Sequence, residues 1–285
     1  MAAQLPFAPG ARESGFTLTG SQSLPGDIVV EAFDRRTGAP LGDDYRPLEF
    51  PAVERWGPMP DPQRTVRVVG SAAEFNFRYG GWMSFRSLSA AVEHSTGQSI
   101  EAFPRVLDWG CGCGRVARHF LNVSGLSVTG ADVDADNIAW CRRNLPNGTW
   151  SELSLRPPSP FATGSFDLLY GISVLTHLRE DDQFRWLDEL HRILRPGGLA
   201  LLTFHGEASL PWSGITGERY AVLCRHGFCD QPNGLYDAAL AEADYYRDTF
   251  HTEEYIRREW GRRFDVLAIR HCAIGNQDLA VLRKA

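Results

Sequence analysis

The sequence predicts an α/β protein with a Rossmann-like, doubly wound and mostly parallel sheet that ends in an antiparallel C-terminal strand. From residue 105 onward, short β-like runs alternate with amphipathic helical stretches, which is the pattern of a parallel sheet flanked by helices. A glycine-rich loop follows the first β-like run and opens the first helical stretch. Two β-like runs on either side of Gly275 close the chain and predict a terminal hairpin.

Each expected element has a local signal. Asp134 stands where it can cap the helix expected over 134–145, and "RPGG" ends the helix expected over 181–194. The expected strands cover 105–109, 126–133, 149–155, 166–173, 199–206, 264–272 and 277–284, and the other expected helices cover 114–123 and 252–260.

Two segments depart from this alternation. Residues 1–70 form an N-terminal extension, in which 27–33 and 39–41 around "DRRTG" predict a β-hairpin before a proline-rich stretch from Arg46 to Pro62. Residues 206–250 interrupt the main domain, expected over 71–285, with Gly, Pro and aromatic residues. This insertion starts at the carboxyl edge of the sheet, where open α/β sheets bind ligands, so we expect a lid. The alternative is a structural excursion that covers helices or makes a dimer contact.

Composition and charge exclude several classes of protein. The formal net charge of −6 argues against a nucleic-acid binder, and we interpret the basic cluster Arg257–Arg263 as a solvated helix end. Lys284 is the only lysine among the 29 basic residues, which excludes a phosphate-binding G-x-x-x-x-G-K-[ST] loop and disfavours pyridoxal phosphate chemistry. The arginine bias is typical of a GC-rich bacterial genome.

The sequence also bears on compartment and metal binding. No apolar run approaches the ~20 residues of a membrane span, and the N-terminal stretch lacks a signal-peptide pattern, so we expect a cytoplasmic protein with no membrane contact. We expect the six cysteines to be free thiols. Cys111 and Cys113, and the stretch with Cys224, His226 and Cys229, do not have a standard zinc-ligand spacing, so no metal is expected.

The loop "GCGCG" lies where backbone N–H groups and a helix N-terminus can meet a nucleotide-like cofactor. A dinucleotide fingerprint G-x-G-x-x-G/A needs a small residue at position 115, but the chain has Arg115. Because arginine would crowd the approach of a pyrophosphate, a cofactor without phosphates fits better than NAD.

Four motifs in order resemble those of the class I S-adenosylmethionine-dependent methyltransferases. "VLDWGCGCG" is similar to their first motif and "VTGADVD" to their second, which ends in an acid at Asp132. "FDLLYGISVLTHL" and "LHRILRPGGLALLTFHG" are similar to the motifs around the fourth and fifth strands. The resemblance covers residues 75 to 285 and implies S-adenosylmethionine as the cofactor.

The resemblance and the spacing together give a cofactor site. Asp132 lies 22 residues after Gly110, which suits an acid that binds the ribose hydroxyls, although a helix-capping or surface role is the alternative. Asp108 is expected at the aminoacyl end of the cofactor, or as a structural cap of the loop. The adenine-binding acid of many family members is missing here. The expected cofactor-binding residues are Asp108, Gly110, Cys111, Gly112, Gly114, Asp132, Val133, Ser154, Leu155, Ser173 and Tyr79.

Methyl transfer needs a base only when the acceptor has a proton to lose. The candidates are His177, after the fourth strand, and His205 with Glu207, after the fifth; a structural role is the alternative for each histidine. Phe75 to Gly81 either folds over the cofactor or packs as an ordinary helix. The expected partner is a small-molecule acceptor. The sequence does not determine the oligomeric state, for which a homodimer is one alternative. An NAD-dependent oxidoreductase and a non-catalytic binding module are the competing functions.

Overall fold

A computed structural model of the chain describes residues 28–30, 48–50, 56–234, 242 and 245–285. It divides into two units, Met1–Arg55 and Trp56–Ala285. In the first unit, β1 (Ile28–Val30) pairs antiparallel with β2 (Leu48–Phe50). The first strand of the predicted hairpin is therefore present. Residues 39–41, the second strand that we predicted, lie outside the described residues, and the partner of β1 is β2.

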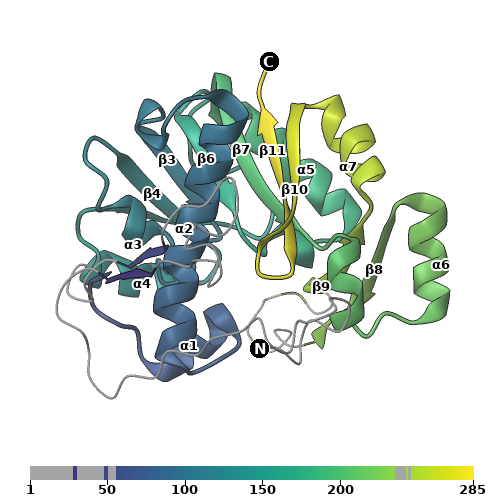
Figure 1. Cartoon of the computed structure of the whole chain (residues 1–285), viewed down its shortest axis with the longest axis horizontal. Coiled ribbons are helices and arrows are strands. Elements are labelled where there is room, and N and C mark those ends of the chain that lie inside the picture. The colour runs from purple at the N-terminus through teal and green to yellow at the C-terminus, as the bar shows by residue number, and fades with distance from the viewer. Residues whose placement is uncertain (1–27, 31–47, 51–55, 235–241, 243–244) are drawn as a thin grey trace, which may run out of the picture. The chain divides into compact units, whose positions relative to one another are not determined.

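The second unit is built on a seven-stranded sheet with the order β10-β11-β7-β6-β3-β4-β5 (Figure 1). Its strands are β3 (Arg105–Trp109), β4 (Ser127–Asp132), β5 (Thr149–Glu152), β6 (Phe166–Gly171), β7 (Leu194–Phe204), β10 (Asp265–Ile274) and β11 (Gln277–Arg283). Strands β7, β6, β3, β4 and β5 are parallel to one another, whereas β11 is antiparallel to β7 and β10. The predicted fold class, including its antiparallel strand, is confirmed.

Helices cover both faces of this sheet, and Figure 1 shows α2 across its front. Val106 packs in one buried cluster with Leu88 of α2, and Leu107 packs in another with Leu190 of α5 and Ile256 of α7. Neighbouring residues of β3 thus point to opposite faces, as the two-residue period of a strand requires. The α-helices are α1 (Pro62–Val69), α2 (Glu74–Thr96), α3 (Ala117–Phe120), α4 (Ala135–Asn144), α5 (Glu180–Ile193), α6 (Gly217–His226) and α7 (Glu253–Glu259), and the 3₁₀ helices are η3 (Ile100–Ala102), η4 (Leu175–His177), η5 (Glu207–Trp212) and η7 (Trp260–Arg262).

One predicted helix is shorter than expected. The sequence predicts a helix over 114–123, but α3 begins at Ala117, because Gly114 has the left-handed φ of 71° that ends regular helical geometry. None of the helices in the described part of the chain is both long and apolar enough to cross a membrane.

The described part of the insertion, residues 206–234, 242 and 245–250, contains regular secondary structure. It contains η5, α6 and an antiparallel pair of strands, β8 (Phe228–Pro232) and β9 (Arg247–His251). The Thr216 side chain caps the start of α6, and Gly227 ends the helix in the left-handed region with φ 77°. Leu223, Cys229 and Phe250 form a small buried cluster of their own. The insertion is thus a small subdomain beside the end of β7, to which an isolated bridge between His205 and Phe250 joins it.

Candidate functional site

The candidate site lies at the carboxyl edge of the sheet. The chain leaves β3 for β4 on one side and later returns to β6 on the other side of β3. Ligands of open α/β sheets bind at such a switch point. The glycine loop, residues 110–114, follows β3 at this point.

The loop has a backbone geometry that requires glycine. Gly110 and Gly112 have φ values of 78° and 52°, in the left-handed region. A Cβ on Gly110 would lie 2.3 Å from Cγ2 of Val174, so no larger residue fits. The N–H groups of Gly110 and Cys111 donate to the carbonyl of Ala131 at 2.8 and 3.1 Å, which anchors the loop to β4. The Cys111 side chain is buried, and cofactor binding by this residue stays a prediction.

Asp132, the last residue of β4, holds the loop in place. Its Oδ2 accepts from the N–H of Gly112 at 2.7 Å, and its Oδ1 accepts from the N–H of Asp134 at 2.8 Å. Burial raises the pKa of the Asp132 carboxyl against these hydrogen bonds, which lower it. Each carboxylate oxygen can accept a further hydrogen bond, so ribose binding by Asp132 stays a prediction.

Asp108 is a second buried acid near the loop. Its side chain is 4% exposed, and burial raises its pKa to about 7, although the Tyr170 hydroxyl and the Arg115 guanidinium oppose this shift. The negative charge of Asp132 also raises the pKa of Asp108, so the two carboxylates are close enough to interact. The site therefore holds two desolvated acids, one of which changes its charge near neutral pH.

Other predicted cofactor residues are distributed along the same edge. Val133 follows Asp132 and is 40% exposed. Ser154 and Leu155 follow β5; Ser154 is exposed, and the Leu155 carbonyl accepts hydrogen bonds from Tyr245 and Trp186.

Tyr79 belongs to α2, where it packs on Trp56 and Phe75 at centroid distances of 5.0 and 4.6 Å. The segment Phe75 to Gly81 lies in α2 and approaches the residue after the glycine loop, since a Cβ on Gly81 would lie 2.4 Å from the Arg115 carbonyl oxygen. Folding of this segment over the cofactor stays a prediction.

Ser173 lies at the centre of a hydrogen-bonded group that the sequence analysis missed in part. It has the unusual φ of 58° just after β6. Its N–H donates to Thr203 Oγ1 at 2.8 Å, and its Oγ accepts from Gln277 Nε2 at 2.7 Å. Thr203 and Gln277 were not predicted. The sheet topology could have indicated Gln277, because an antiparallel last strand beside β7 brings the turn before that strand to the carboxyl edge of the sheet.

His177 and His205 lie together beyond β6 and β7, with ring centroids 6.3 Å apart. Nδ1 of His177 lies 2.8 Å from the Arg247 carbonyl oxygen, and Nδ1 of His205 lies 3.2 Å from that of Thr249. A carbonyl can only accept, so each neutral ring carries its proton on Nδ1 and presents the lone pair of Nε2.

The surroundings of the pair keep both rings neutral. Burial lowers the pKa of His177 to about 4 and also lowers the pKa of His205. Tyr246, one of the aromatic residues of the insertion, stacks on His177 with ring centroids 4.0 Å apart, and Asp248 Oδ1 lies 3.8 Å from His177 Nδ1. Neither contact is predictable from the sequence. Glu207, predicted beside His205, is exposed at the start of η5.

Arg115 and the cysteines of the described residues do not form a metal-binding or second ligand-binding site with one another. Arg115 is directed toward α2, where its Nη1 lies 3.4 Å from Ser84 Oγ. The described residues contain no group of three or more His, Cys, Asp or Glu side chains arranged to hold a metal ion.

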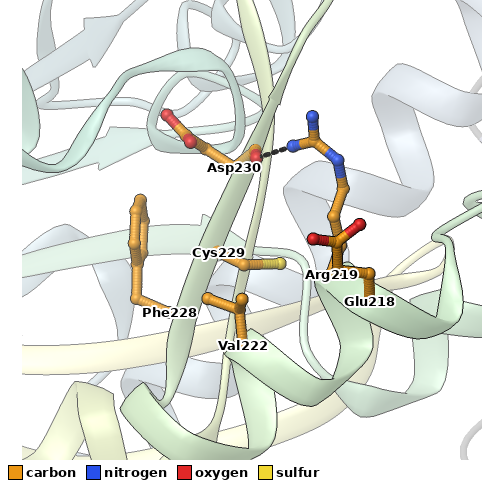
Figure 2. Close-up of a pocket in the computed structure, with 6 residues that line it drawn as sticks. All are labelled: Glu218, Arg219, Val222, Phe228, Cys229 and Asp230. Carbon is orange, nitrogen blue, oxygen red and sulfur yellow. Dashed lines mark hydrogen bonds between the residues drawn. The ribbon is translucent and has the colours of Figure 1, made fainter.

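A pocket in the insertion lies between α6 and β8 (Figure 2). Arg219 and Val222 of α6 and Phe228, Cys229 and Asp230 of β8 are among its lining residues. The Arg219 guanidinium donates to the Asp230 carbonyl, which fastens the helix to the strand.

Comparison with known proteins identifies the same part of the chain. Residues 106–198 match the family model described as a methyltransferase domain. The methyltransferase GfsG of Streptomyces halstedii is 32% identical over 136 residues, which are 43% of this chain and 48% of that protein. The O-methyltransferase resE of Aspergillus sclerotiorum is 32% identical over 155 residues, 53% of this chain and 49% of that protein. The chain thus spans about half the length of these curated relatives.

A solved structure shows the same fold. The S-adenosylmethionine-dependent methyltransferase from Mesorhizobium loti superposes with a TM-score of 0.51 and 18% identity, and the match covers 68% of this chain and 98% of that one.

Proposed function

We propose a methyl-transfer function on the premise that the chain belongs to the class I S-adenosylmethionine-dependent methyltransferases. The acceptor in this proposal is an oxygen or nitrogen atom of a small molecule, such as a natural product or a saccharide-like metabolite. The observation that carries the proposal is the glycine loop bonded to Asp132 at the switch point of the sheet. The relatives named as methyltransferases support it.

The residues of the site fit S-adenosylmethionine chemically. The cofactor has a positive sulfonium, an ammonium and a ribose diol, and Asp108 offers a buried carboxylate and Asp132 a partly buried one beside a loop that admits only glycine. A cationic ligand is favourable next to buried acids, because it offsets the cost of their desolvation. We assign Asp132 to the ribose and Asp108 to the aminoacyl end.

The bound cofactor supplies an activated methyl group, which reacts by in-line displacement. The protein aligns the acceptor and excludes water. An O–H or N–H acceptor would lose its proton on methylation, with S-adenosylhomocysteine as the leaving group. We assign this proton to Nε2 of His177 or His205, since Nδ1 of each ring is already protonated.

The insertion, residues 206–250, is proposed as the lid of the acceptor site. It follows β7 at the carboxyl edge, and its strand β9 holds both histidines. We assign an acceptor contact to Tyr220 of α6, whose side chain is 50% exposed.

Tyr220→Ala and Trp212→Ala are expected to raise the acceptor KM or lower kcat while S-adenosylhomocysteine affinity stays nearly intact, because a lid contacts the acceptor and not the cofactor. Steady-state kinetics and calorimetry on the same preparations measure both quantities. If both folded variants keep wild-type kinetics, the acceptor binds outside the insertion.

Cofactor affinity is expected to rise between pH 6 and pH 8. Burial raises the pKa of Asp108 to about 7, so at pH 6 this side chain is mostly the neutral acid. A positively charged ligand favours the carboxylate, so binding releases a proton, and affinity falls by up to about tenfold per pH unit below pH 7. Calorimetry of S-adenosylmethionine binding in two buffers of different ionisation enthalpy measures the number of protons released per cofactor bound. Asp108→Asn should abolish the release, and a wild type that releases no proton contradicts the assignment.

A turnover assay tests the function itself. Candidate acceptors, chosen from the chemistry encoded by neighbouring genes, are incubated with S-adenosylmethionine, and S-adenosylhomocysteine and the methylated product are quantified. A chain that binds the cofactor but methylates none of these acceptors would favour the non-catalytic binding module. Arg115 disfavours the NAD-dependent oxidoreductase.

A further inference from the structure

The helix α1 covers the glycine loop. The Asp61 side chain caps its start by accepting from the N–H of Arg64 at 3.0 Å, and Gly70 ends it with φ 67°. A Cβ on Gly112 would lie 2.8 Å from Cγ2 of Val68, so the isopropyl group of Val68 rests directly on the Cα of this glycine. The open side of Gly112 is therefore occupied by a side chain of α1.

Two arginines of α1 fasten it to the segment after Asp132. Arg64 Nη2 lies 2.7 Å from Asp136 Oδ1, and Arg67 Nη2 lies 2.8 Å from Asp136 Oδ2. Arg67 Nε lies 3.5 Å from Asp134 Oδ2. The paired carboxylate of Asp136 is 53% exposed, so salt screens these contacts and each one is individually weak.

The fastened segment is directly coupled to the ribose acid. The N–H of Asp134 donates to Asp132 Oδ1, and the Asp134 side chain accepts from the N–H groups of Asp136 and Asn137 at the start of α4. The arginines thus hold α1 against the same short turn that orients Asp132.

We propose that α1 is a roof over the cofactor site, and that its ion pairs with Asp134 and Asp136 must open for the cofactor to enter or leave. This inference rests on the proposed function. Val68 lies on the loop that the cofactor needs, and the arginines of α1 hold the turn after the partly buried Asp132, so a ligand that enters between α1 and the loop displaces α1. Arg64 and Arg67 therefore determine how long the cofactor stays bound.

The test is the kinetics of S-adenosylhomocysteine binding to the full chain, followed by stopped-flow tryptophan fluorescence. The variant R64Q/R67Q removes the ion pairs and keeps side chains of helical propensity. Its association and dissociation rates are expected to rise about tenfold, which corresponds to the loss of several exposed ion pairs. Raising NaCl should speed exchange in the wild type toward the variant and leave the variant unchanged.

R257Q is the matched control, since Arg257 pairs with the exposed Glu253 on α7 and should leave both rates unchanged. Melting temperatures confirm that all variants are folded. Equal rates and equal salt dependence in the wild type and R64Q/R67Q would contradict the proposal that α1 must open for the cofactor to enter or leave. A wild type that does not bind S-adenosylhomocysteine would instead overturn the proposed function, so the two failures are distinguishable.

Discussion

Asp132→Ala is expected to weaken S-adenosylhomocysteine binding by about 1.5–3 kcal/mol, because it removes charge-assisted hydrogen bonds to the ribose hydroxyls. The structure adds a second reason for the loss. Without the carboxylate, the N–H of Gly112 loses its 2.7 Å acceptor, so the glycine loop keeps only its backbone hydrogen bonds to Ala131 of β4.

Titration calorimetry measures this effect, and Asp132→Asn is the matched control. Asparagine keeps the size of the side chain and one acceptor oxygen, but its amide would face an N–H group, so an intermediate loss of affinity is expected. Unchanged affinity in a folded Asp132→Ala variant would refute the ribose assignment.

The second large effect is acid destabilisation by buried histidines. Burial lowers the pKa of His119 and His251 to about 3 and that of His177 to about 4. The unfolded state binds these protons at its ordinary pKa of about 6.5, so stability is lost as the pH falls below that value and continues to fall toward the native pKa. Each of these histidines is expected to lower the free energy of unfolding by about 2 kcal/mol between pH 7 and pH 5. Asp108 opposes this trend, because its native pKa is raised.

His251 gives the sharpest test. Its Nε2 lies 2.9 Å from Gln183 Oε1, an acceptor, so Nε2 carries the proton and a second proton on Nδ1 would be buried. Nδ1 has no hydrogen-bond partner among the residues that the structure describes. Urea unfolding of the wild type and His251→Phe at pH 7 and pH 5 isolates this residue. The stability difference between the two proteins should change by about 2 kcal/mol in favour of the variant at pH 5. A difference that is independent of pH contradicts the prediction.

The fold could be predicted because its signals are local and repeated. Alternation of strands and helices fixes a parallel sheet, and the two-residue period of β3 places Val106 and Leu107 in opposite clusters. The spacing from Gly110 to Asp132 likewise predicted an acid at the end of the second strand, and Asp132 is the last residue of β4, while its hydrogen bond to the glycine loop was not predicted.

The remaining features depend on contacts between distant residues. The protonation of His177 and His205 is set by carbonyl groups of β9, which no side-chain pattern encodes. The contact of Val68 with Gly112 depends on where α1 packs, and the arginines that hold it read as ordinary surface charges. The insertion looked irregular because its helix and strands are short and rich in turn residues.

The most direct test of the account is calorimetry of the chain with S-adenosylhomocysteine and, separately, with NAD. We expect S-adenosylhomocysteine to bind with one site per chain and NAD to give no heat of binding, since Arg115 stands where a dinucleotide loop needs a small residue. Tight binding of NAD with no response to S-adenosylhomocysteine would contradict it.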